Sequence, residues 1–384
     1  MVHLAQARAS SGAATPKQQA TAPAPLHALT SIRFVLALGV VLFHYQVNMI
    51  TPEAVPIALI ERARLGVDIF FILSGFVLAH VYGPQIQEGR YSHRRFIVAR
   101  FARIYPTHLA MLVLMGLVAI IAVMLRQPFA AAGHSLTDWF ADLFLVQAWL
   151  PISPTEWNGP AWSLSAEWAA YLTFPLFAYV GLRRGRNPWL TVLLAALVFA
   201  VMDLIYRRIS GEVVTHADST FGVLRIPGQF LYGIGLQQLS LRLHPRPAMA
   251  VAAAIISASA LLASMHWQLD ERITVALAGP FVLSLAMVSR SGADGVLAHP
   301  AALLAGEASY ALYLAHMPVL VIWKNAIAVL TGSDSSYRLS VVEVAVLLPI
   351  TLAAAVALYT LWENPARAWI RGRLSSPSNS LGTS

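Results

Sequence analysis

The sequence contains no cysteine and few charged residues. The lack of cysteine excludes disulfides, thiolate catalysis and cysteine-ligated metals, although it says nothing about the redox compartment. Asp, Glu, Lys and Arg together make up 11% of the 384 residues, whereas 58% of the chain is hydrophobic. A soluble domain is about a quarter charged. No water-soluble fold can hide so much apolar surface, so we expect lipid to be the solvent for much of the chain.

Acidic residues are outnumbered by basic ones, which gives a net charge of +8. Such a charge can indicate nucleic-acid binding, but here the basic residues lie mostly in short segments between apolar runs. Nearly all are arginine, and the only lysines are Lys17 and Lys324. If the N-terminus is cytoplasmic, most of them fall on the cytoplasmic side, which is the pattern of a multi-pass membrane protein. We therefore predict cytoplasmic termini and no nucleic-acid partner.

Apolar runs recur along the chain, each close to the roughly 20 residues that one helical span requires. They predict an all-α, polytopic bundle of about ten transmembrane helices. The amphipathic segment 136–150 is too short and acidic to span, so we place it at the membrane interface. The predicted spans cover residues 29–50, 66–82, 105–125, 162–182, 188–206, 220–240, 247–266, 272–289, 303–330 and 340–362.

Both ends of the chain are polar. Residues 1–27 are predicted to be a disordered tail, because they are rich in Ala, Ser, Thr, Gln and Pro and contain no apolar run. That lack also argues against a cleaved signal peptide. The membrane domain is predicted at 28–370 and a second polar tail at 371–384. We find no inverted repeat of the kind that many transporters carry.

Ionisable residues inside spans are functional candidates, because lipid disfavours a charge by at least a few kcal/mol. The first span contains Arg33 and His44 in RFVLALGVVLFH. Eleven residues correspond to about three helical turns, so the two side chains share a face about 16 Å apart along the axis. The alternative is a snorkelling arginine and a histidine that bonds to a neighbouring helix.

The second and third predicted spans begin with further charges. Asp68 lies in GVDIFFILSGF, where Gly66 and Gly75 permit close helix approach. An ion pair with Arg33 or another arginine is as well supported for Asp68 as a catalytic role. RRFIVARFARIYP then places Arg100 and Arg103 on one helical face, either as topology anchors or as phosphate-binding groups.

Polar stripes mark two later spans. In WSLSAEWAAY, the residues Ser163, Glu167 and Tyr171 recur at helical spacing and predict a lined cavity. In SYALYLAH the same spacing applies to Ser309, Tyr313 and His316. The last span closes with WENPARAWIR, where Pro365 is expected to stop the helix.

These motifs together resemble the acyltransferase-3 family of integral-membrane O-acyltransferases. Six of them occur in the family's order over residues 28–370. They are RFVLALGVVLFH, GVDIFFILSGF, RRFIVARFARIYP, WSLSAEW, SYALYLAH and WENPAR. The chain departs from the family at Thr30-Ser31-Ile32, where many relatives carry an acidic residue and a glycine.

The resemblance implies a ten-helix enzyme that takes an acyl group, commonly acetyl, from cytoplasmic acyl-CoA and transfers it to a glycan hydroxyl. It implies that Arg33 and His44 are essential and that Arg100 and Arg103 are the family's paired arginines. Many members carry an extra esterase-like domain, and none is expected after the membrane part here. The implied location is the bacterial inner membrane, with an exopolysaccharide, lipopolysaccharide or other glycan as acceptor.

Roles for the candidate residues follow. His44 is the predicted general base, since its pKa near 6.5 is tunable and it can accept the proton of an attacking hydroxyl, although a transient acyl-histidine remains an alternative. No metal is required. The remaining predictions assign catalytic support to Arg33, Glu167 and Asp68, coenzyme A binding to Arg95, Arg100 and Arg103, and substrate contacts to Ser163, Tyr171, Tyr313 and His316.

Two other functions compete with this one. In a proton-coupled transporter or flippase, Arg33, His44, Asp68 and Glu167 would form a proton or substrate path. A membrane scaffold would not explain the two polar stripes. Hydrolysis of acyl-CoA or acylation of a glycan by the purified protein would separate the enzyme from both alternatives.

Overall fold

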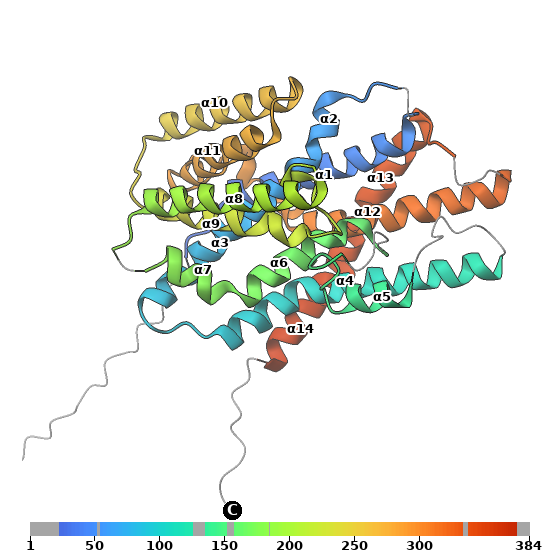
Figure 1. Cartoon of the computed structure of the whole chain (residues 1–384), viewed down its shortest axis with the longest axis horizontal. Coiled ribbons are helices and arrows are strands. Elements are labelled where there is room, and N and C mark those ends of the chain that lie inside the picture. The colour runs from blue at the N-terminus through green and yellow to red at the C-terminus, as the bar shows by residue number, and fades with distance from the viewer. Residues whose placement is uncertain are drawn as a thin grey trace, which may run out of the picture.

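A computed structural model describes residues 23–51, 54–125, 135–151, 157–183, 185–332 and 337–374 (Figure 1). Helices and turns make up this described part, and its only β contact is an isolated bridge between Asp218 and Phe221. Most of the tail predicted at 1–27 and residues 375–384 of the second tail lie outside the described residues. The all-α prediction is confirmed.

Fourteen α-helices follow one another along the described chain. Within it, eight helical stretches are long and apolar enough to cross a membrane, so the protein is a multi-pass membrane protein. The helices are α1 (His27–Met49), α2 (Ala58–Arg62), α3 (Gly66–Gln87), α4 (His93–Met124), α5 (Leu136–Leu143), α6 (Trp162–Leu172), α7 (Phe174–Gly181), α8 (Pro188–Ser210), α9 (Ile226–Ser240), α10 (Pro247–His266), α11 (Glu271–Arg290), α12 (Pro300–Thr331), α13 (Val341–Leu358) and α14 (Asn364–Leu374).

Two of the predicted spans differ from a single long helix. The run 162–182 is divided into α6 and α7, because Pro175 in the first turn of α7 has no N–H to continue the preceding helix. The run 220–240 starts as a 3₁₀ turn, Gly222–Arg225, and only then becomes the 15-residue α9. Both runs lie against the inner helix α3, and α9 also packs on α8.

Helices α3 and α9 form the centre of the bundle. In the most apolar part of the helical stretch that contains α3, 67% of the residues are buried, against 22% in α8 and 22% in α10. A Cβ at Gly75 would overlap the carbonyl of Phe230, and a Cβ at Gly233 would overlap that of Ile72. The two backbones therefore meet at glycines, as GVDIFFILSGF predicted for Gly75.

Outer helices present apolar side chains outward. On α8, Leu190, Leu193, Leu197 and Leu204 are all exposed, as a lipid-facing surface requires. The segment predicted at the interface, 136–150, contains α5, whose Asp138 and Asp142 are buried while Leu136 and Phe140 are exposed. Burial raises the pKa of the Asp142 carboxyl to about 7.

The end of the last span corrects a prediction. Pro365 does not stop the helix: a π-helical turn, Tyr359–Glu363, leads directly into α14, with Pro365 as its second residue. Proline is tolerated there, because the π-helical turn before it already departs from the i→i−4 hydrogen-bond pattern: the N–H of Asn364 bonds to the Tyr359 carbonyl. Helix α14 packs against α4, and it lies along the lower edge of Figure 1.

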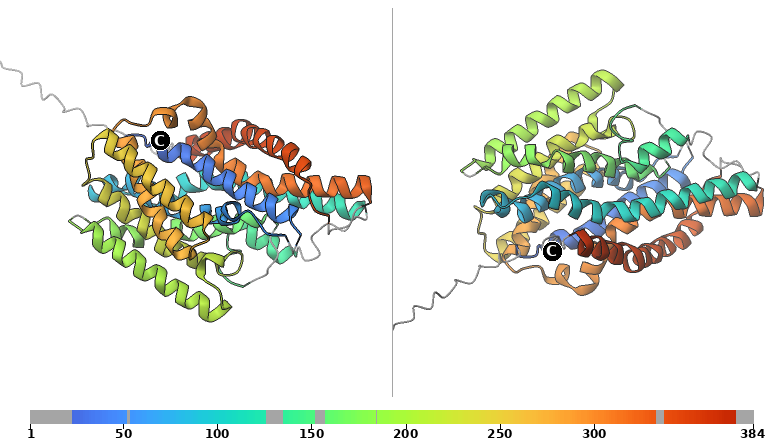
Figure 2. Two further views of the ribbon diagram at one scale, coloured as in Figure 1. Left: turned by 90° about the horizontal axis from the view of Figure 1, so that it is seen from above. Right: turned by 90° about the horizontal axis from the view of Figure 1, so that it is seen from below.

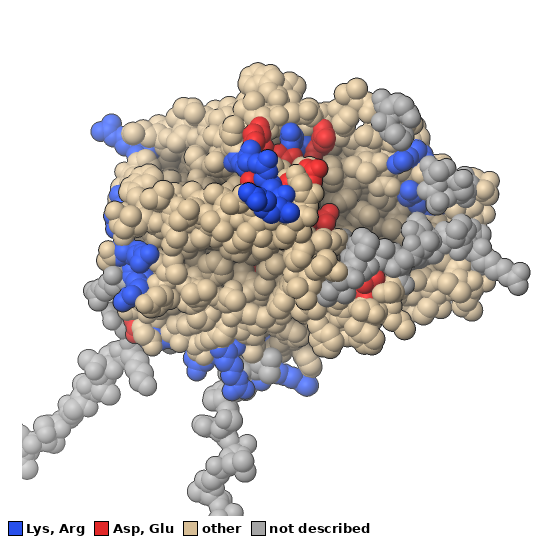
Figure 3. Space-filling model, in the orientation of Figure 1, with Lys and Arg blue, Asp and Glu red and all other residues tan. Residues whose placement is uncertain are grey.

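The bundle has two distinguishable ends. Helices α4 and α12 extend past the others at one end, as both views of Figure 2 show. Figure 3 shows basic side chains at the opposite end, along the lower edge near α14 and at the upper right, and a patch of both signs near the upper middle of the view. The prediction that the termini are cytoplasmic stays a prediction.

Candidate functional site

A cavity of about 300 Å³ lies where α1, α3, α4, α6, α12 and α14 meet. We call it the arginine cavity. Its apolar lining comes mainly from α3, including Phe70, Phe71 and Val77. Its polar lining comes from residues far apart in the sequence, namely Arg33, Ser74, Arg100, Arg103, Ser163, Glu167, Tyr171, Ser309, Tyr310, Tyr313 and Arg367.

The charges of the arginine cavity are unbalanced. Its lining, within the described part of the chain, contains four arginines and a single carboxylate, Glu167. The Glu167 carboxylate accepts a hydrogen bond from the Ser74 hydroxyl. Among the described residues, no ion pair joins any of the four arginines to a carboxylate, and the Nε atoms of Arg100 and Arg367 are buried without a hydrogen-bond acceptor. Half-buried guanidinium groups without a salt-bridge partner favour an anionic ligand such as phosphate.

A second acid, Glu363, does not line the cavity but is close enough to interact with three of these arginines. Its side chain is 2% exposed, and its Oε2 has no hydrogen-bond donor within the described part of the chain. It interacts electrostatically with Arg33, Arg103 and Arg367. Glu363 is the last residue of the π-helical turn, a type of distortion that is frequent at functional sites.

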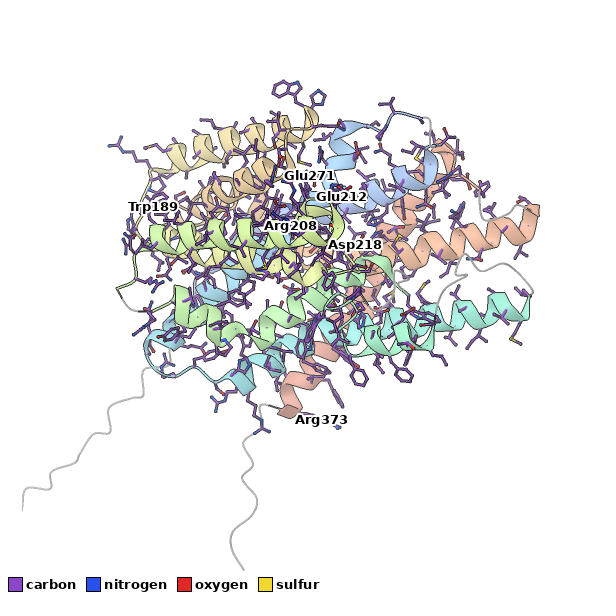
Figure 4. All side chains as sticks on the ribbon, viewed as in Figure 1. Trp189, Arg208, Glu212, Asp218, Glu271 and Arg373 are labelled. Atoms are coloured by element: carbon purple, nitrogen blue, oxygen red, sulfur yellow. The ribbon has the colours of Figure 1, made fainter. Side chains whose placement is uncertain are left out.

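A second cavity, also about 300 Å³, contains His44, and we call it the histidine cavity. Its walls come from α1, α3, α12 and the turns around residues 160 and 216. Its lining comprises Val40, Phe43, His44, Arg64, Val67, Pro160, Trp162, Thr215, His216, Asp218, Arg225 and Tyr313. Figure 4 shows Asp218, which lines the histidine cavity, well away from Arg373, which lies near the end of α14, a helix that contributes to the arginine cavity.

His44 is paired with His316. The Nδ1 of His44 lies 2.9 Å from the Val40 carbonyl oxygen and 3.2 Å from the Nε2 of His316. A carbonyl only accepts, so we assign the hydrogen of His44 to Nδ1, shared with the lone pair of His316 Nε2. The Nε2 of His44 then keeps its lone pair, which is the form a general base needs. His316 itself is fully buried.

Ion pairs surround the histidine cavity. Arg225 donates to both carboxylate oxygens of Asp68, which also accepts from Gln229 at 2.6 Å. Arg64 and Arg62 share the carboxylate of Glu271. All the arginines that line this cavity are therefore neutralised by an acid, and Arg225 also lies 4.7 Å from the ring centre of Trp162.

The structure brings most of the predicted residues together. Arg33, Arg100, Arg103, Ser163, Glu167, Tyr171 and Tyr313 all line the arginine cavity, and His44 and His316 form the pair described above. Arg95 is exposed and lines neither cavity. Asp68 is fully buried, lines neither cavity and pairs with Arg225 rather than with Arg33. The functional roles of all these residues stay predictions.

Several residues of the two cavities were not anticipated from the sequence. Ser74 and Arg367 lie within quoted motifs, yet neither was singled out. Glu363 was not predicted as a candidate because the last predicted span ends at Trp362. Glu363 therefore falls just outside the segments in which a charged residue is treated as a functional candidate. No role is predicted for Arg64 or Arg225 from the sequence. The described residues contain no group of three or more metal-ligating side chains.

Comparisons with known proteins agree with this architecture. A family model described as "Acyltransferase domain" matches residues 26–360. The chain is 40% identical over 159 residues to the acyltransferase MdmB of Streptomyces mycarofaciens, which is 40% of this chain and 39% of that protein. It is 28% identical over 133 residues to the peptidoglycan O-acetyltransferase OatA of Listeria monocytogenes, covering 32% of this chain and 21% of that protein.

A third relative is protein 2 in the picA locus of Rhizobium radiobacter, 40% identical over 114 residues, with 27% of this chain and 60% of that protein covered. The chain spans less than two thirds of the length of each of these relatives. No solved structure matches it. The family model, by contrast, extends over nearly the whole membrane part. The chain belongs to the acyltransferase-3 family.

Proposed function

We propose that the protein transfers an acyl group, most simply acetyl, from acyl-CoA to a hydroxyl of a glycan such as an exopolysaccharide or lipopolysaccharide. One observation carries the proposal: two cavities share lining residues inside the bundle, one lined by four arginines that form no salt bridge among the described residues, and the other by a histidine. The first suits an anionic donor and the second suits activation of a neutral nucleophile.

Coenzyme A is a suitable donor for the arginine cavity because its phosphates are the anions that the guanidinium groups lack. Arg100 and Arg103 come from one face of α4, and Arg367 comes from α14. Arginine binds phosphate in a bidentate manner, with fixed geometry. The apolar side chains of α3, including Phe70 and Phe71, would accommodate the acyl arm beyond the phosphates.

The acceptor fits the histidine cavity. Its outer lining includes His216 and Asp218, which are exposed, and Arg64, so a polyhydroxylated ligand would find both donors and acceptors there. Burial, together with the neighbouring Arg64 charge, lowers the pKa of His216. The imidazole is therefore mainly neutral at pH 7 and able to hydrogen-bond to a hydroxyl.

The reaction then follows from the two sites. His44 Nε2 accepts the proton of the acceptor hydroxyl while that oxygen attacks the thioester carbonyl carbon. The carbon–sulfur bond breaks, an ester forms on the glycan, and the coenzyme A thiolate receives the proton from the imidazolium. Arg33, on the same helix as His44, binds the donor and fixes its position relative to His44. General-base assistance of this kind is worth roughly 10²–10⁴-fold in rate.

The membrane arrangement is part of the proposal. The arginine cavity would open to the cytoplasm, where acyl-CoA is made, and the protein would reside in the bacterial inner membrane. Reporter fusions should place Arg94 in the cytoplasm and Asp270 outside. An external Arg94 would remove the donor-side assignment.

Acyl-CoA turnover by the purified protein in lipid nanodiscs is the direct test. Because the chain has no cysteine, a thiol reagent would report only the coenzyme A that is released. We expect thioester cleavage that increases with added glycan, and ester groups on that glycan by mass spectrometry. A proton-coupled transporter or flippase would move the glycan without consuming acyl-CoA, and that result would replace the proposal.

A further inference from the structure

Among the described residues, Val67 and Tyr313 are the two that line both the arginine cavity and the histidine cavity. Val67 lies in the first turn of α3, and Tyr313 lies near the middle of α12. Arg33 and Glu167 are on one side of these two side chains, and His44 is on the other. A donor in the first cavity and the base in the second are therefore separated by Val67 and Tyr313.

Tyr313 is held in place by hydrogen bonds and by packing. Its hydroxyl donates to the Pro160 carbonyl at 3.0 Å and lies 2.8 Å from the Ser163 hydroxyl. Ser163 also donates to Pro160, at 3.0 Å. The Tyr313 ring meets Phe70 edge to face, with ring centres 6.3 Å apart, and the residue is 6% exposed. The position of the ring is thus fixed by its hydroxyl on one side and by an aromatic contact on the other.

We propose that Tyr313 and Val67 form a septum that keeps water in the histidine cavity away from a thioester in the arginine cavity until a bound acceptor displaces the tyrosine ring. This inference rests on the proposed function. An acyl-CoA enzyme with a polar second cavity faces a competing reaction, because water can take the place of the acceptor hydroxyl. Tyr313 would therefore set how much acyl-CoA is lost to hydrolysis when no acceptor is bound.

The competing reaction uses the same groups as transfer. Water attacks the thioester carbonyl carbon, His44 accepts its proton, and the carbon–sulfur bond breaks. The products are the free acid and coenzyme A, whose sulfur takes up a proton. No other reactant is needed, so acceptor-free release of coenzyme A measures how often the septum opens.

The decisive variant is Tyr313→Phe, which keeps the ring and removes its hydroxyl. The loss of one or two hydrogen bonds should raise the ratio of open to closed septum by about five- to thirtyfold. Acceptor-free hydrolysis of acetyl-CoA should therefore rise by about that factor, with an unchanged KM for acetyl-CoA. Adding His44→Ala should abolish the increase, because both variants would act on the same reaction.

A matched control separates this effect from a general loss of packing. Tyr45 is also buried, follows His44 on α1 and bonds through its hydroxyl to Thr351 at 2.5 Å, but it lines neither cavity. Tyr45→Phe should leave acceptor-free hydrolysis unchanged. If Tyr313→Phe does not fold, Val67→Ala opens the same septum and should raise hydrolysis in the same direction.

The outcomes distinguish the septum from the proposed function. If the wild-type protein neither binds nor cleaves acetyl-CoA, the proposed function fails. If it cleaves acetyl-CoA and neither Tyr313→Phe nor Val67→Ala changes the rate, the septum is wrong while the function stands. If Tyr313→Phe instead raises KM without raising hydrolysis, Tyr313 is a donor contact, and the septum is again wrong.

Discussion

The arginine cavity and the histidine cavity are similar in volume, but their charges are arranged in opposite ways. Arg64 and Arg225 beside the histidine cavity are each bound to a carboxylate. The arginines of the other cavity have no such partner within the described residues, and the single acid among them is bonded to Ser74. Because a charge that is partly removed from water without a salt-bridge partner costs free energy, the unpaired arginines indicate a site kept for a ligand, whereas the paired ones hold helices together.

Removing the base should produce the largest effect. His44→Ala is expected to lower acyl transfer by about 10²–10⁴-fold per correctly inserted molecule, because a hydroxyl is a poor nucleophile without a base. Turnover should be compared with that of His266→Ala, a histidine that is exposed and lines neither cavity. Near-normal specific activity in His44→Ala would overturn the assignment and make His316 the next candidate.

Breaking a buried ion pair should affect stability instead. Asp68→Asn leaves Arg225 buried without its counter-charge, which typically costs about 3–5 kcal/mol. Thermal unfolding in nanodiscs should show a large loss, with activity per folded molecule retained. The control is Glu88→Gln, whose pair with Arg90 is exposed and worth at most about 1 kcal/mol. Normal stability with lost turnover would instead support the catalytic role predicted for Asp68.

Removing uncompensated arginines should affect donor binding and leave stability unchanged. Each charge-assisted contact to phosphate is worth roughly 1.5–3 kcal/mol, so Arg100→Gln with Arg103→Gln should raise the apparent KM for acyl-CoA well over tenfold. Arg94→Gln with Arg95→Gln is the matched comparison on the same helix. An equal rise in that variant would restore the donor role that the sequence predicted for Arg95.

Neutralising Glu363 should have the smallest effect. The carboxyl reduces the positive potential around Arg33 and Arg103, so Glu363→Gln should lower the apparent KM for acyl-CoA by roughly two- to fivefold, the scale of a weak ion pair. Steady-state kinetics at low salt would detect the change. A higher KM would mean that Glu363 orients the arginines and does not merely reduce their charge.

Much of the bundle could be predicted from the sequence, because long apolar runs and lipid length leave few alternatives. The failures have local causes. Pro365 was expected to end the last helix, but the chain continues as a helix through it, and Pro365 is the second residue of α14. The length of an apolar run also does not show whether the helix is outer or inner, and the predicted span 220–240 contains the inner α9, which is only 15 residues long.

The candidate site was predictable only in part. Helical spacing placed Ser163, Glu167 and Tyr171 on one face, and all three line the arginine cavity. Spacing cannot show which helices become neighbours, so the pairing of Asp68 with Arg225, 157 residues away, could not be derived. The same limit applies to the contact between His44 and His316 and to the position of Tyr313 between the two cavities.

Titration of the purified protein with coenzyme A tests the central claim most directly, because it separates the two cavities. The wild-type protein and His44→Ala should bind coenzyme A with the same Kd, although only the wild type turns acetyl-CoA over. Arg100→Gln with Arg103→Gln should bind more than tenfold more weakly. Equal binding by all three proteins, or weakened binding in His44→Ala alone, would contradict the division into a donor cavity and a base cavity.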